Sequence, residues 1–234
     1  MDVLWEAIRT AVGLLVDRDA ETLEILFLSL RISGLATLLA VALGMPLGAV
    51  LAVGRFRGRR ILLAVLNTGM GLPPVVIGLV VTVFLWRSGP LGQLGLLYTP
   101  TAMVAAQAII ATPLVAGISA AAFGGTDPEL RLQMQALGAG RVRSLLVVAS
   151  EVRLPLLAAA MAGFGAALSE VGAAMMVGGN LAGETRVLTT AAVLETSRGN
   201  FGLALALGLV LLTVAFVVSA VLTVVGQSGG RLPS

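Results

Sequence analysis

The chain has 234 residues, of which 58% are hydrophobic and 12% are charged, and its mean hydropathy is +1.02. A water-soluble domain carries about 25% charged residues. Here the charges stand in blocks between long apolar runs, so the composition fits a polytopic membrane protein. Cysteine, histidine and lysine do not occur in the sequence. This excludes disulfides, thiolate or imidazole metal sites, and catalysis by Cys/His or Ser/His/Asp groups.

The net charge is +3 and every basic residue is an arginine. The arginines flank the apolar runs and do not form a basic patch interleaved with aromatic residues. We therefore expect no nucleic-acid partner.

Residues 1–22 precede the first apolar run that is long enough to cross a membrane. The segment is acidic at its start and lacks a discrete apolar core, so it is not expected to be a signal peptide. Within it, residues 3–16 are too short to span. Their apolar positions, together with Trp5, favour a helix in the outer membrane interface; a sixth, degenerate span is the alternative.

Residues 23–226 are expected to form one all-α transmembrane domain, followed by a tail at 227–234. Five apolar stretches each exceed the roughly 20 residues that cross a hydrocarbon core about 30 Å thick. The expected spans are about 25–53, 61–86, 101–123, 154–177 and 201–225.

The arginines predict the orientation of these spans. Nine lie in the connections after the first, third and fifth spans, and five lie on the other side. Basic residues are enriched in cytoplasmic loops, so the N-terminus is expected outside and the C-terminus inside. The connection 124–153 is then cytoplasmic.

The first span contains two columns at a spacing of four residues. Small side chains that permit close helix approach form one column: Ala36, Ala40, Gly44, Gly48 and Ala52. Hydroxyls form the other: Ser29, Ser33 and Thr37. The hydroxyls either face a polar pathway or bond back to carbonyls one turn earlier.

The second span reads "NTGMGLPPVVIG" at residues 67–78. Pro73 and Pro74 remove two donors and clash with the preceding turn, so a regular helix cannot continue through them. Freed backbone groups at membrane depth must be buried in protein or line a wet cavity. We expect a broken helix; a proline kink without a transport role is the alternative.

The fourth span is rich in alanine and glycine and contains Glu170 beside Ser169. A carboxyl group inside a span is costly and indicates a functional site. Arg31 is the other ionisable residue within a span, and we expect it to pair with Glu170, either as a gate or as a structural ion pair between helices.

The polar stretch "ELRLQMQALGAGRVR" at 129–143 interrupts the apolar runs. Asp127, Pro128 and Glu129 form a helix start, with a capping carboxylate, proline at the first position and an acid in the first turn. Gly138 and Gly140 end that helix or admit a bend. The pattern predicts a short cytoplasmic helix, a bend and a second helix, which is either a docking element or an ordinary interfacial loop.

The stretch "DPELRLQMQALGAGRVRSLL" resembles the cytoplasmic loop of ABC-importer permeases. "SEVGAAMMVGGN" is similar to the end of the fourth span in molybdate and tungstate permeases. Further stretches resemble the tungstate branch: "LEILFLSLRISG", "NTGMGLPPVVIGL", "RSGPLG", "TPTAMVAAQ" and "TRVLTTAAVLETSRGNFGLALALG". Together they cover residues 23 to about 223.

The resemblance implies a type I ABC-importer permease fold in a bacterial or archaeal plasma membrane. It implies a homodimer, surrounded by lipid, that lines one pathway for an oxyanion, tungstate or molybdate. Two cytoplasmic ATPase subunits would bind the ATP and magnesium, and an extracytoplasmic binding protein would deliver the anion. This chain itself is then not expected to be an enzyme or to bind a cofactor.

The resemblance also implies roles for particular residues. In the loop, those expected to couple the permease to its ATPase are Asp127, Glu129, Leu132, Gln135, Ala136, Leu137, Gly138, Ala139 and Arg141. Those expected along the pathway or gate are Ser29, Arg31, Ser33, Thr37, Thr68, Pro73, Pro74, Ser169, Glu170 and Asn180. Hydroxyls and amides suit an anion that must be released again.

One departure from the family concerns the loop. Where the family pattern reads Glu-Ala-Ala, this chain has Leu132, Gln133 and Met134. The contact with the ATPase is then made either through the apolar Leu132 and Met134 or through Glu129, one turn earlier.

Two other classes of function compete with a permease subunit. A secondary transporter with broken helices usually shows an internal repeat, and the sequence shows none. A membrane enzyme would need an acid/base constellation, and Glu170 is the sole acid deep in a span. The permease subunit predicts that no nucleotide site is present, and the sequence contains no G-x-x-x-x-G-K-[ST] motif.

Overall fold

The computed structural model describes residues 2–54 and 56–228, without side chains for 2–4, 128, 131, 132, 135, 141, 227 and 228. The described part is helical and contains no strand. Its elements in chain order are α1 (Asp2–Val16), α2 (Ala20–Val53), α3 (Arg59–Met70), α4 (Pro74–Leu85), the 3₁₀ helix η1 (Gly92–Leu94), α5 (Pro100–Gly124), α6 (Pro128–Ala136), α7 (Arg141–Glu151), α8 (Arg153–Leu168), α9 (Gly172–Gly178), α10 (Leu188–Ser197) and α11 (Phe201–Ser228).

Three of the described helices, α2, α5 and α11, are long and apolar enough to cross a membrane. Two bent pairs could each supply one more span: α3 with α4, at 103°, and α7 with α8, at 79°. The described chain thus has three to five candidate spans, which agrees with the expected five. The positions of the membrane boundaries on these helices stay a prediction.

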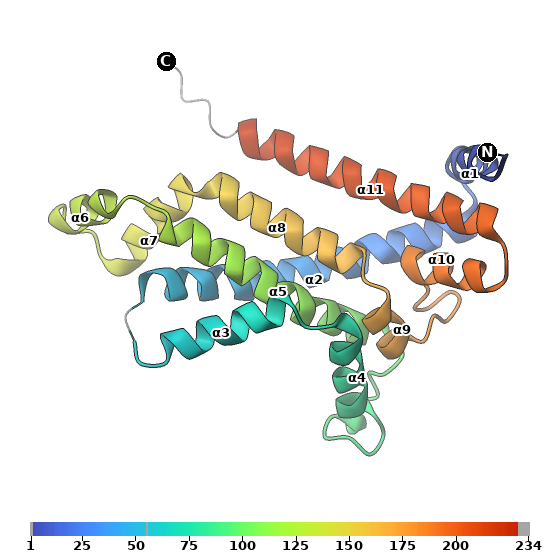
Figure 1. Cartoon of the computed structure of the whole chain (residues 1–234), viewed down its shortest axis with the longest axis horizontal. Coiled ribbons are helices and arrows are strands. Elements are labelled where there is room, and N and C mark those ends of the chain that lie inside the picture. Colours follow the sequence, from blue (N-terminus) through green and yellow to red (C-terminus); the bar gives the residue numbers. More distant parts are fainter. Residues whose placement is uncertain (1, 55, 229–234) are drawn as a thin grey trace.

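The close packing of α2 against α5 forms the centre of the bundle (Figure 1). A side-chain carbon at Gly48 would lie 2.6 Å from the backbone oxygen of Ala116, and one at Gly44 would lie 3.0 Å from that of Thr112. Ala36 and Ala40 are fully buried on the same face of α2. Within a membrane, helices associate through such van der Waals packing. The column of small residues therefore has the predicted packing role.

The break expected within residues 61–86 separates α3 from α4 at Gly71, Leu72 and Pro73. Pro74 occupies the first turn of α4, where its missing N–H costs nothing. The two half-helices meet at 103°, and α4 projects from the side of the bundle (Figure 1). The two consecutive prolines thus stop one helix and start another in a new direction.

Helix α1 has 15 residues and is about 22 Å long, which is shorter than a hydrocarbon core of about 30 Å. It packs against α11, with Ala7 and Ala11 buried and with Trp5, Val12 and Val16 exposed. The guanidinium of Arg9 lies 5.5 Å from the centre of the Trp5 ring. This arrangement suits the expected interfacial helix better than a sixth span.

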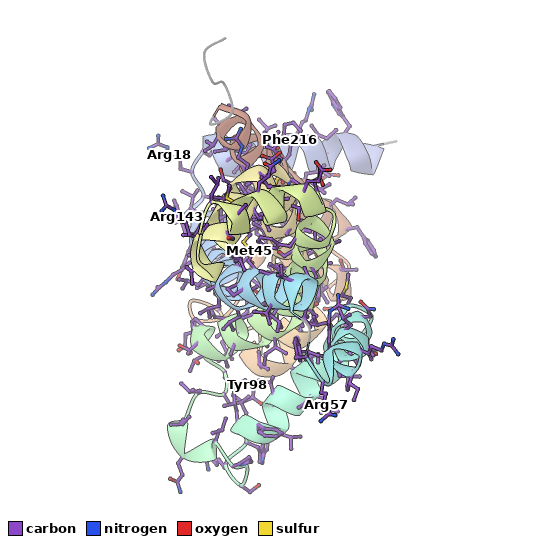
Figure 2. The ribbon with its side chains drawn as sticks, turned by 90° about the vertical axis from the view of Figure 1, so that its left-hand side faces the viewer. Arg18, Met45, Arg57, Tyr98, Arg143 and Phe216 are labelled. Carbon is purple, nitrogen blue, oxygen red and sulfur yellow. The ribbon has the colours of Figure 1, made fainter. Side chains whose placement is uncertain are left out.

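The expected cytoplasmic connections share one end of the molecule. The connection between α2 and α3 lies at the same end as α6 and α7, whereas α1 and α10 lie at the opposite end (Figure 1). In the view onto the first end, Arg57 and Arg143 project outward on opposite sides (Figure 2). The predicted orientation requires these arginine-bearing connections to be on one side, and the fold meets that requirement.

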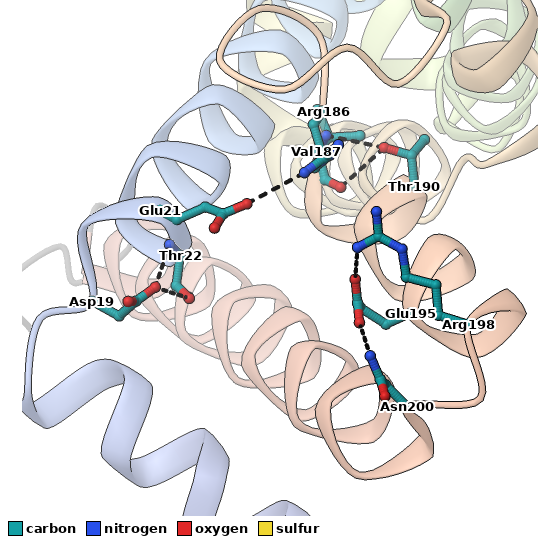
Figure 3. A network of polar contacts seen from close by, with 9 residues as sticks. All are labelled: Asp19, Glu21, Thr22, Arg186, Val187, Thr190, Glu195, Arg198 and Asn200. Atoms are coloured by element: carbon teal, nitrogen blue, oxygen red, sulfur yellow. Dashed lines mark hydrogen bonds and ion pairs between the residues drawn. The ribbon is translucent and has the colours of Figure 1, made fainter.

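A polar network joins the elements at the opposite end (Figure 3). Asp19 caps α2 by accepting a hydrogen bond of 2.8 Å from the backbone N–H of Thr22. Arg186 forms an ion pair of 3.3 Å with Glu21, so the segment before α10 is tied to the start of α2. These contacts fix the first turn of α2 against the connection between α9 and α10.

A second group within this network closes the turn between α10 and α11 (Figure 3). The amide of Asn200 donates to Glu195 at 2.7 Å, and Arg198 forms an ion pair of 2.7 Å with the other carboxylate oxygen. The hydrogen bond from Asn200, with the charge and hydrogen bond of Arg198, lowers the pKa of Glu195. The carboxylate form is therefore favoured in the folded state.

We predict that this turn makes stability sensitive to acid. Because folding lowers the pKa of Glu195, its contribution is present above the ordinary glutamate pKa, about 4.3, and is lost as the pH falls through the folded-state value. Asn200→Ala removes the largest cause of the shift, so the variant should be less stable than the wild type near pH 7 and should lose less stability on acidification, and the two profiles should converge at low pH. Thermal unfolding of the detergent-solubilised protein between about pH 3 and pH 7 measures this. Thr196→Ala, whose hydroxyl bonds only within α10, is the control, and coincident pH profiles for Asn200→Ala and wild type would contradict the prediction.

Candidate functional site

The fourth expected span is not one continuous helix. Helix α8 ends at Leu168 and α9 begins at Gly172. Between them, the buried carboxylate of Glu170 accepts a hydrogen bond of 2.8 Å from the backbone N–H of Ala173. The first N–H groups of a helix have no partner within it, and a side-chain oxygen three residues earlier is the usual substitute. Glu170 therefore lies in the break between the two helices, and its side chain satisfies one of the first N–H groups of α9.

The break at Glu170 lies against the start of α4. A side-chain carbon at Gly172 would lie 2.5 Å from the Cγ2 of Val75 and 3.6 Å from a carboxylate oxygen of Glu170. One turn further, a carbon at Gly78 would lie 2.6 Å from the Cα of Ala173. The half-helices α4 and α9 thus pack backbone to backbone, each beginning at a break in a longer apolar stretch.

Helix α10 also reaches this junction. The hydroxyl of Thr189 donates to the backbone oxygen of Glu170 at 3.0 Å. Helices α4, α8, α9 and α10 therefore meet around a single buried acid. Such a concentration of broken helices is the type of structure that transporters place at their binding sites.

The expected ion pair between Arg31 and Glu170 is wrong. No ion pair joins them in the described structure, because Glu170 is buried as the cap of α9. Arg31 lies on the exposed face of α2, next to the buried residues Ile32 and Ser33. The side chain of Arg31 therefore lies on the surface, whereas that of Glu170 lies in the interior.

The hydroxyl column of α2 bonds within the subunit. Ser29 donates to the backbone oxygen of Ile25 at 2.7 Å and accepts from the N–H of Leu188 at 2.9 Å, so it holds the start of α10. Thr37 donates to the backbone oxygen of Ser33 at 2.6 Å. These contacts match the back-bonding alternative, and a role of these hydroxyls along a pathway stays a prediction.

Ser33 contacts α5 and reveals a polar residue that the sequence reasoning missed. Its hydroxyl lies 3.4 Å from the side-chain oxygen of Gln107, which is 2% exposed. A polar amide in the middle of an apolar span is unusual, because its burial costs free energy. The single glutamine within the apolar sequence "AAQAII" could have indicated this residue.

The remaining expected pathway residues are spread over the breaks. Thr68 and Pro73 are exposed at the end of α3 and the start of α4, and Pro74 is half-buried. Ser169 is exposed and donates to the backbone oxygen of Gly165 at 2.8 Å. The structure thus brings the start of α4 close to Glu170 through Val75 and Gly172, whereas Arg31 is exposed on α2.

Asn180 follows α9 in a left-handed conformation, with φ of 54°. The buried Oδ1 atom of its side chain has no hydrogen-bond partner among the described residues. The nearby Thr185, fully buried, donates to the backbone oxygen of Gly178 at 2.5 Å and accepts from the N–H of Leu181 at 2.9 Å. Thr185 was also missed, because a hydroxyl in a connection gives no periodic signal.

At the other end of the molecule, α6 begins at Pro128, as expected. The side chain of Asp127 accepts from the backbone N–H of Glu129 at 2.8 Å. The helix stops at Gly138, whose φ of 74° lies in the left-handed region, and the N–H of Ala139 donates to the backbone oxygen of Met134 at 2.9 Å. This 6→1 bond is the Schellman ending of a helix, so the predicted helix, bend and second helix are present.

The helix pair α6–α7 presents apolar side chains to its surroundings. Leu137 is 78% exposed, Val142 is 76% exposed and Leu146 is 65% exposed. Ala136 and Glu129 are exposed and Ala139 is half-buried. The side chains of the expected coupling residues Leu132, Gln135 and Arg141 lie outside the described part of the structure.

Comparison with known proteins gives matches over almost the whole chain. The family model described as the inner membrane component of binding-protein-dependent transport systems matches residues 44–228. The tungstate uptake system permease protein TupB of Peptoclostridium acidaminophilum is 40% identical over 222 residues, covering 95% of this chain and 97% of that protein. TupB of Campylobacter jejuni is 30% identical over 216 residues, covering 92% and 90%.

The fold also matches a solved structure. The crystal structure of an amino acid ABC transporter with histidines superimposes with a TM-score of 0.61, at 20% identity, over 93% of this chain and 96% of that one. At this identity the likeness concerns the fold, and it agrees with the expected permease architecture.

We predict that Glu170 acts through the acceptor oxygen of its side chain and not through a charge pair. Glu170→Ala should destabilise the protein by about 1–2 kcal/mol, because the N–H of Ala173 loses its cap. Glu170→Gln keeps an acceptor oxygen and should retain most of the stability. Thermal unfolding in detergent measures both, with Ser169→Ala as a control that loses only a local bond. Equal losses for the alanine and glutamine variants would contradict the capping role.

Proposed function

The chain belongs to the family of inner membrane components of binding-protein-dependent transport systems, and on this basis we propose that it imports a tetrahedral oxyanion as the membrane-spanning subunit of an ATP-driven transporter. Tungstate is the proposed cargo, and molybdate, an anion of the same shape and charge, is the alternative. The observation that carries the proposal is the 40% identity to a tungstate uptake permease over nearly the full length of both chains. The chain itself supplies the pathway and hydrolyses no ATP.

The proposed assembly contains two copies of this subunit, two ATPase subunits in the cytoplasm and an extracytoplasmic binding protein, in a bacterial or archaeal plasma membrane. The sequence lacks a phosphate-binding P-loop, so ATP and magnesium belong to the partner. The arginine-bearing end is then cytoplasmic. In the proposed assembly, the network around Glu21 and Glu195 at the opposite end (Figure 3) would face the binding protein.

Helices α6 and α7 form the proposed contact with the ATPase. Their exposed Leu137, Val142 and Leu146 offer an apolar surface of the kind that marks a protein interface. The left-handed Gly138 ends α6 sharply, so the two helices form an angular, stiff element. This element can transmit a displacement because its shape is fixed by the backbone.

The displacement would travel along the chain from α7 into α8. Val148 and Val152 are buried with Ala49 and Phe123, so α7 is anchored beside the ends of α2 and α5. From α8, the motion reaches the break at Glu170 and then the packed pair α4–α9. We infer that α4 and α9 move as one body and alternately close and open the pathway.

A specific observation also favours a second candidate, a secondary transporter. The breaks before α4 and α9 lie side by side, and discontinuous helices are common in that class. The two candidates differ in their energy source. Uptake driven by an ion gradient in the absence of an ATPase would support the second.

We predict that proteoliposomes containing this subunit with its ATPase and binding protein accumulate tungstate only when ATP is supplied on the ATPase side. The purified subunit alone should hydrolyse no ATP. Gly138→Val should sharply reduce uptake, because a β-branched residue at φ of 74° costs at least about 1–2 kcal/mol and distorts the helix ending. ATP hydrolysis and tungstate accumulation, measured together, test the coupling.

Gly140→Val is the matched control for this experiment. Gly138 and Gly140 both have open space where a side chain would be added, but Gly140 has an ordinary φ of −64°. The control should insert and transport nearly as wild type. Equal effects of the two substitutions would contradict a role for the fixed shape of this element.

We further predict that disulfide cross-links distinguish moving from fixed contacts, in a chain that has no natural cysteine. A side-chain carbon at Gly172 would lie 3.6 Å from the Cβ of Val75, and one at Gly163 would lie 4.0 Å from the Cβ of Ala111; both distances suit a disulfide. The pair Val75→Cys/Gly172→Cys joins α4 to α9 and should leave transport nearly intact. The pair Ala111→Cys/Gly163→Cys joins α5 to α8 and should block transport until it is reduced.

Transport before and after reduction measures both pairs, and the reduced proteins serve as their own controls. Block by the α4–α9 cross-link would show that these helices separate during the cycle, against the one-body model.

A further inference from the structure

Arg31 is the single basic residue of α2 and lies on an exposed apolar face. Its neighbours along that face are Phe27, 66% exposed, Leu35, 45% exposed, and Leu38, 65% exposed. The opposite face packs into the subunit through Ile32 and Ser33. The guanidinium therefore belongs to a surface that something outside this subunit covers.

Two of the arginines around the expected outer end have carboxylate partners. Arg186 pairs with Glu21, and Arg198 pairs with Glu195. For Arg31, the described structure contains neither an ion pair nor a hydrogen bond from the side chain. Placing a guanidinium among apolar groups costs free energy unless an anion or water binds it.

The position of Arg31 along α2 places it near the outer rim of the hydrocarbon layer. The side chain of Arg59 donates to the backbone oxygen of Leu51 at 2.6 Å, which marks the arginine-bearing end of the helix. Leu51 and Arg31 are about 30 Å apart along the helix, which is about one hydrocarbon thickness. In the proposed orientation, an anion coming from outside meets the membrane at this level.

The second observation concerns Gly34, one turn from Arg31 on α2. Glycine weakens the interior of a helix by about 1 kcal/mol relative to alanine. At Gly44 and Gly48 the close packing of α5 requires glycine, whereas a side chain added at Gly34 would meet nothing within 4 Å. The bare backbone beside the guanidinium leaves room for a group outside the subunit to approach closely.

We propose that Arg31 and the bare backbone at Gly34 form the entrance contact for the oxyanion between two copies of the subunit. The guanidinium supplies two parallel N–H donors that match two oxygens of a tetrahedral anion. Gly34 lets the anion approach the helix. This proposal rests on the proposed function, since it assigns a residue to the import of that anion.

A lipid phosphate offers the same tetrahedral oxyanion chemistry at this depth. A snorkelling arginine that binds a headgroup needs no bare backbone beside it. The glycine therefore favours the transported anion, and the experiment separates the two sources.

The first arm compares Arg31→Gln, Arg31→Lys and Gly34→Ala in the reconstituted complex with saturating tungstate-loaded binding protein. Loss of the charged contact should slow uptake about tenfold in Arg31→Gln, with a smaller loss in Arg31→Lys. Gly34→Ala has room within the subunit and a better helix former, yet it should also slow uptake. Gly208→Ala, at another helix-interior glycine with nothing within 4 Å, is the matched control and should transport as wild type.

The second arm places a single thiol in the cysteine-free chain by Arg31→Cys. An anionic, membrane-impermeant thiosulfonate added outside should modify it, and tungstate-loaded binding protein with ATP should slow the modification. If a lipophilic maleimide modified the thiol and the impermeant thiosulfonate did not, the residue would face lipid, and the proposal would be overturned. A spontaneous disulfide between two copies, with no access for either reagent, would show a helix contact and also overturn it.

The outcomes separate this inference from the proposed function. Wild-type complex that accumulates neither tungstate nor molybdate would defeat the proposed function. Wild-type uptake that Arg31→Gln and Gly34→Ala leave at the level of Gly208→Ala would defeat the entrance contact alone.

Discussion

A chain inside a hydrocarbon layer must satisfy its backbone N–H and C=O groups within itself, because no water is present to do so. A long helix meets this requirement automatically, and a broken one does not. The described structure breaks two apolar stretches, before Pro74 and before Gly172. Its most distinctive side-chain contacts lie at the second break and in the connection after it, where Glu170, Thr189 and Thr185 each bond a buried backbone group outside the regular helix pattern.

The same contacts determine which parts of the subunit are rigid. Glycine and alanine bring α2 and α5 to backbone contact, and such an interface has few side chains that could rearrange. Helices α4 and α9 have a similar backbone contact with each other, and α9 also packs on the bundle, where Ala173 and Val177 share a core with Ile32 of α2 and Met103 of α5. In the proposed cycle, the α2–α5 pair stays in place while the α4–α9 pair moves.

Much of this arrangement was predictable from local chemistry. Small residues at a spacing of four indicated the α2 interface, two prolines indicated the break before α4, and Asp127 with Pro128 indicated the start of α6. These features depend on residues close together in the sequence. The break at Glu170 and the helix α10 were not predicted, because they depend on contacts with residues far away in the chain. Glu170 was correctly singled out as a costly acid, but its partner is a backbone N–H three residues later and not Arg31. Periodicity identifies an unusual residue inside a span; it does not identify what that residue bonds.

The ending of α6 has a consequence for how the subunit is maintained in a cell. The left-handed Gly138 holds Leu137 out from the surface, and Leu137 and Val142 are each more than three-quarters exposed. Until a partner covers them, these side chains form the kind of apolar patch that chaperones and proteases recognise. In the proposed assembly, a copy made in excess of the ATPase would keep this patch uncovered and would be open to removal. One glycine that shapes a helix end would then also help to match the numbers of the two subunits.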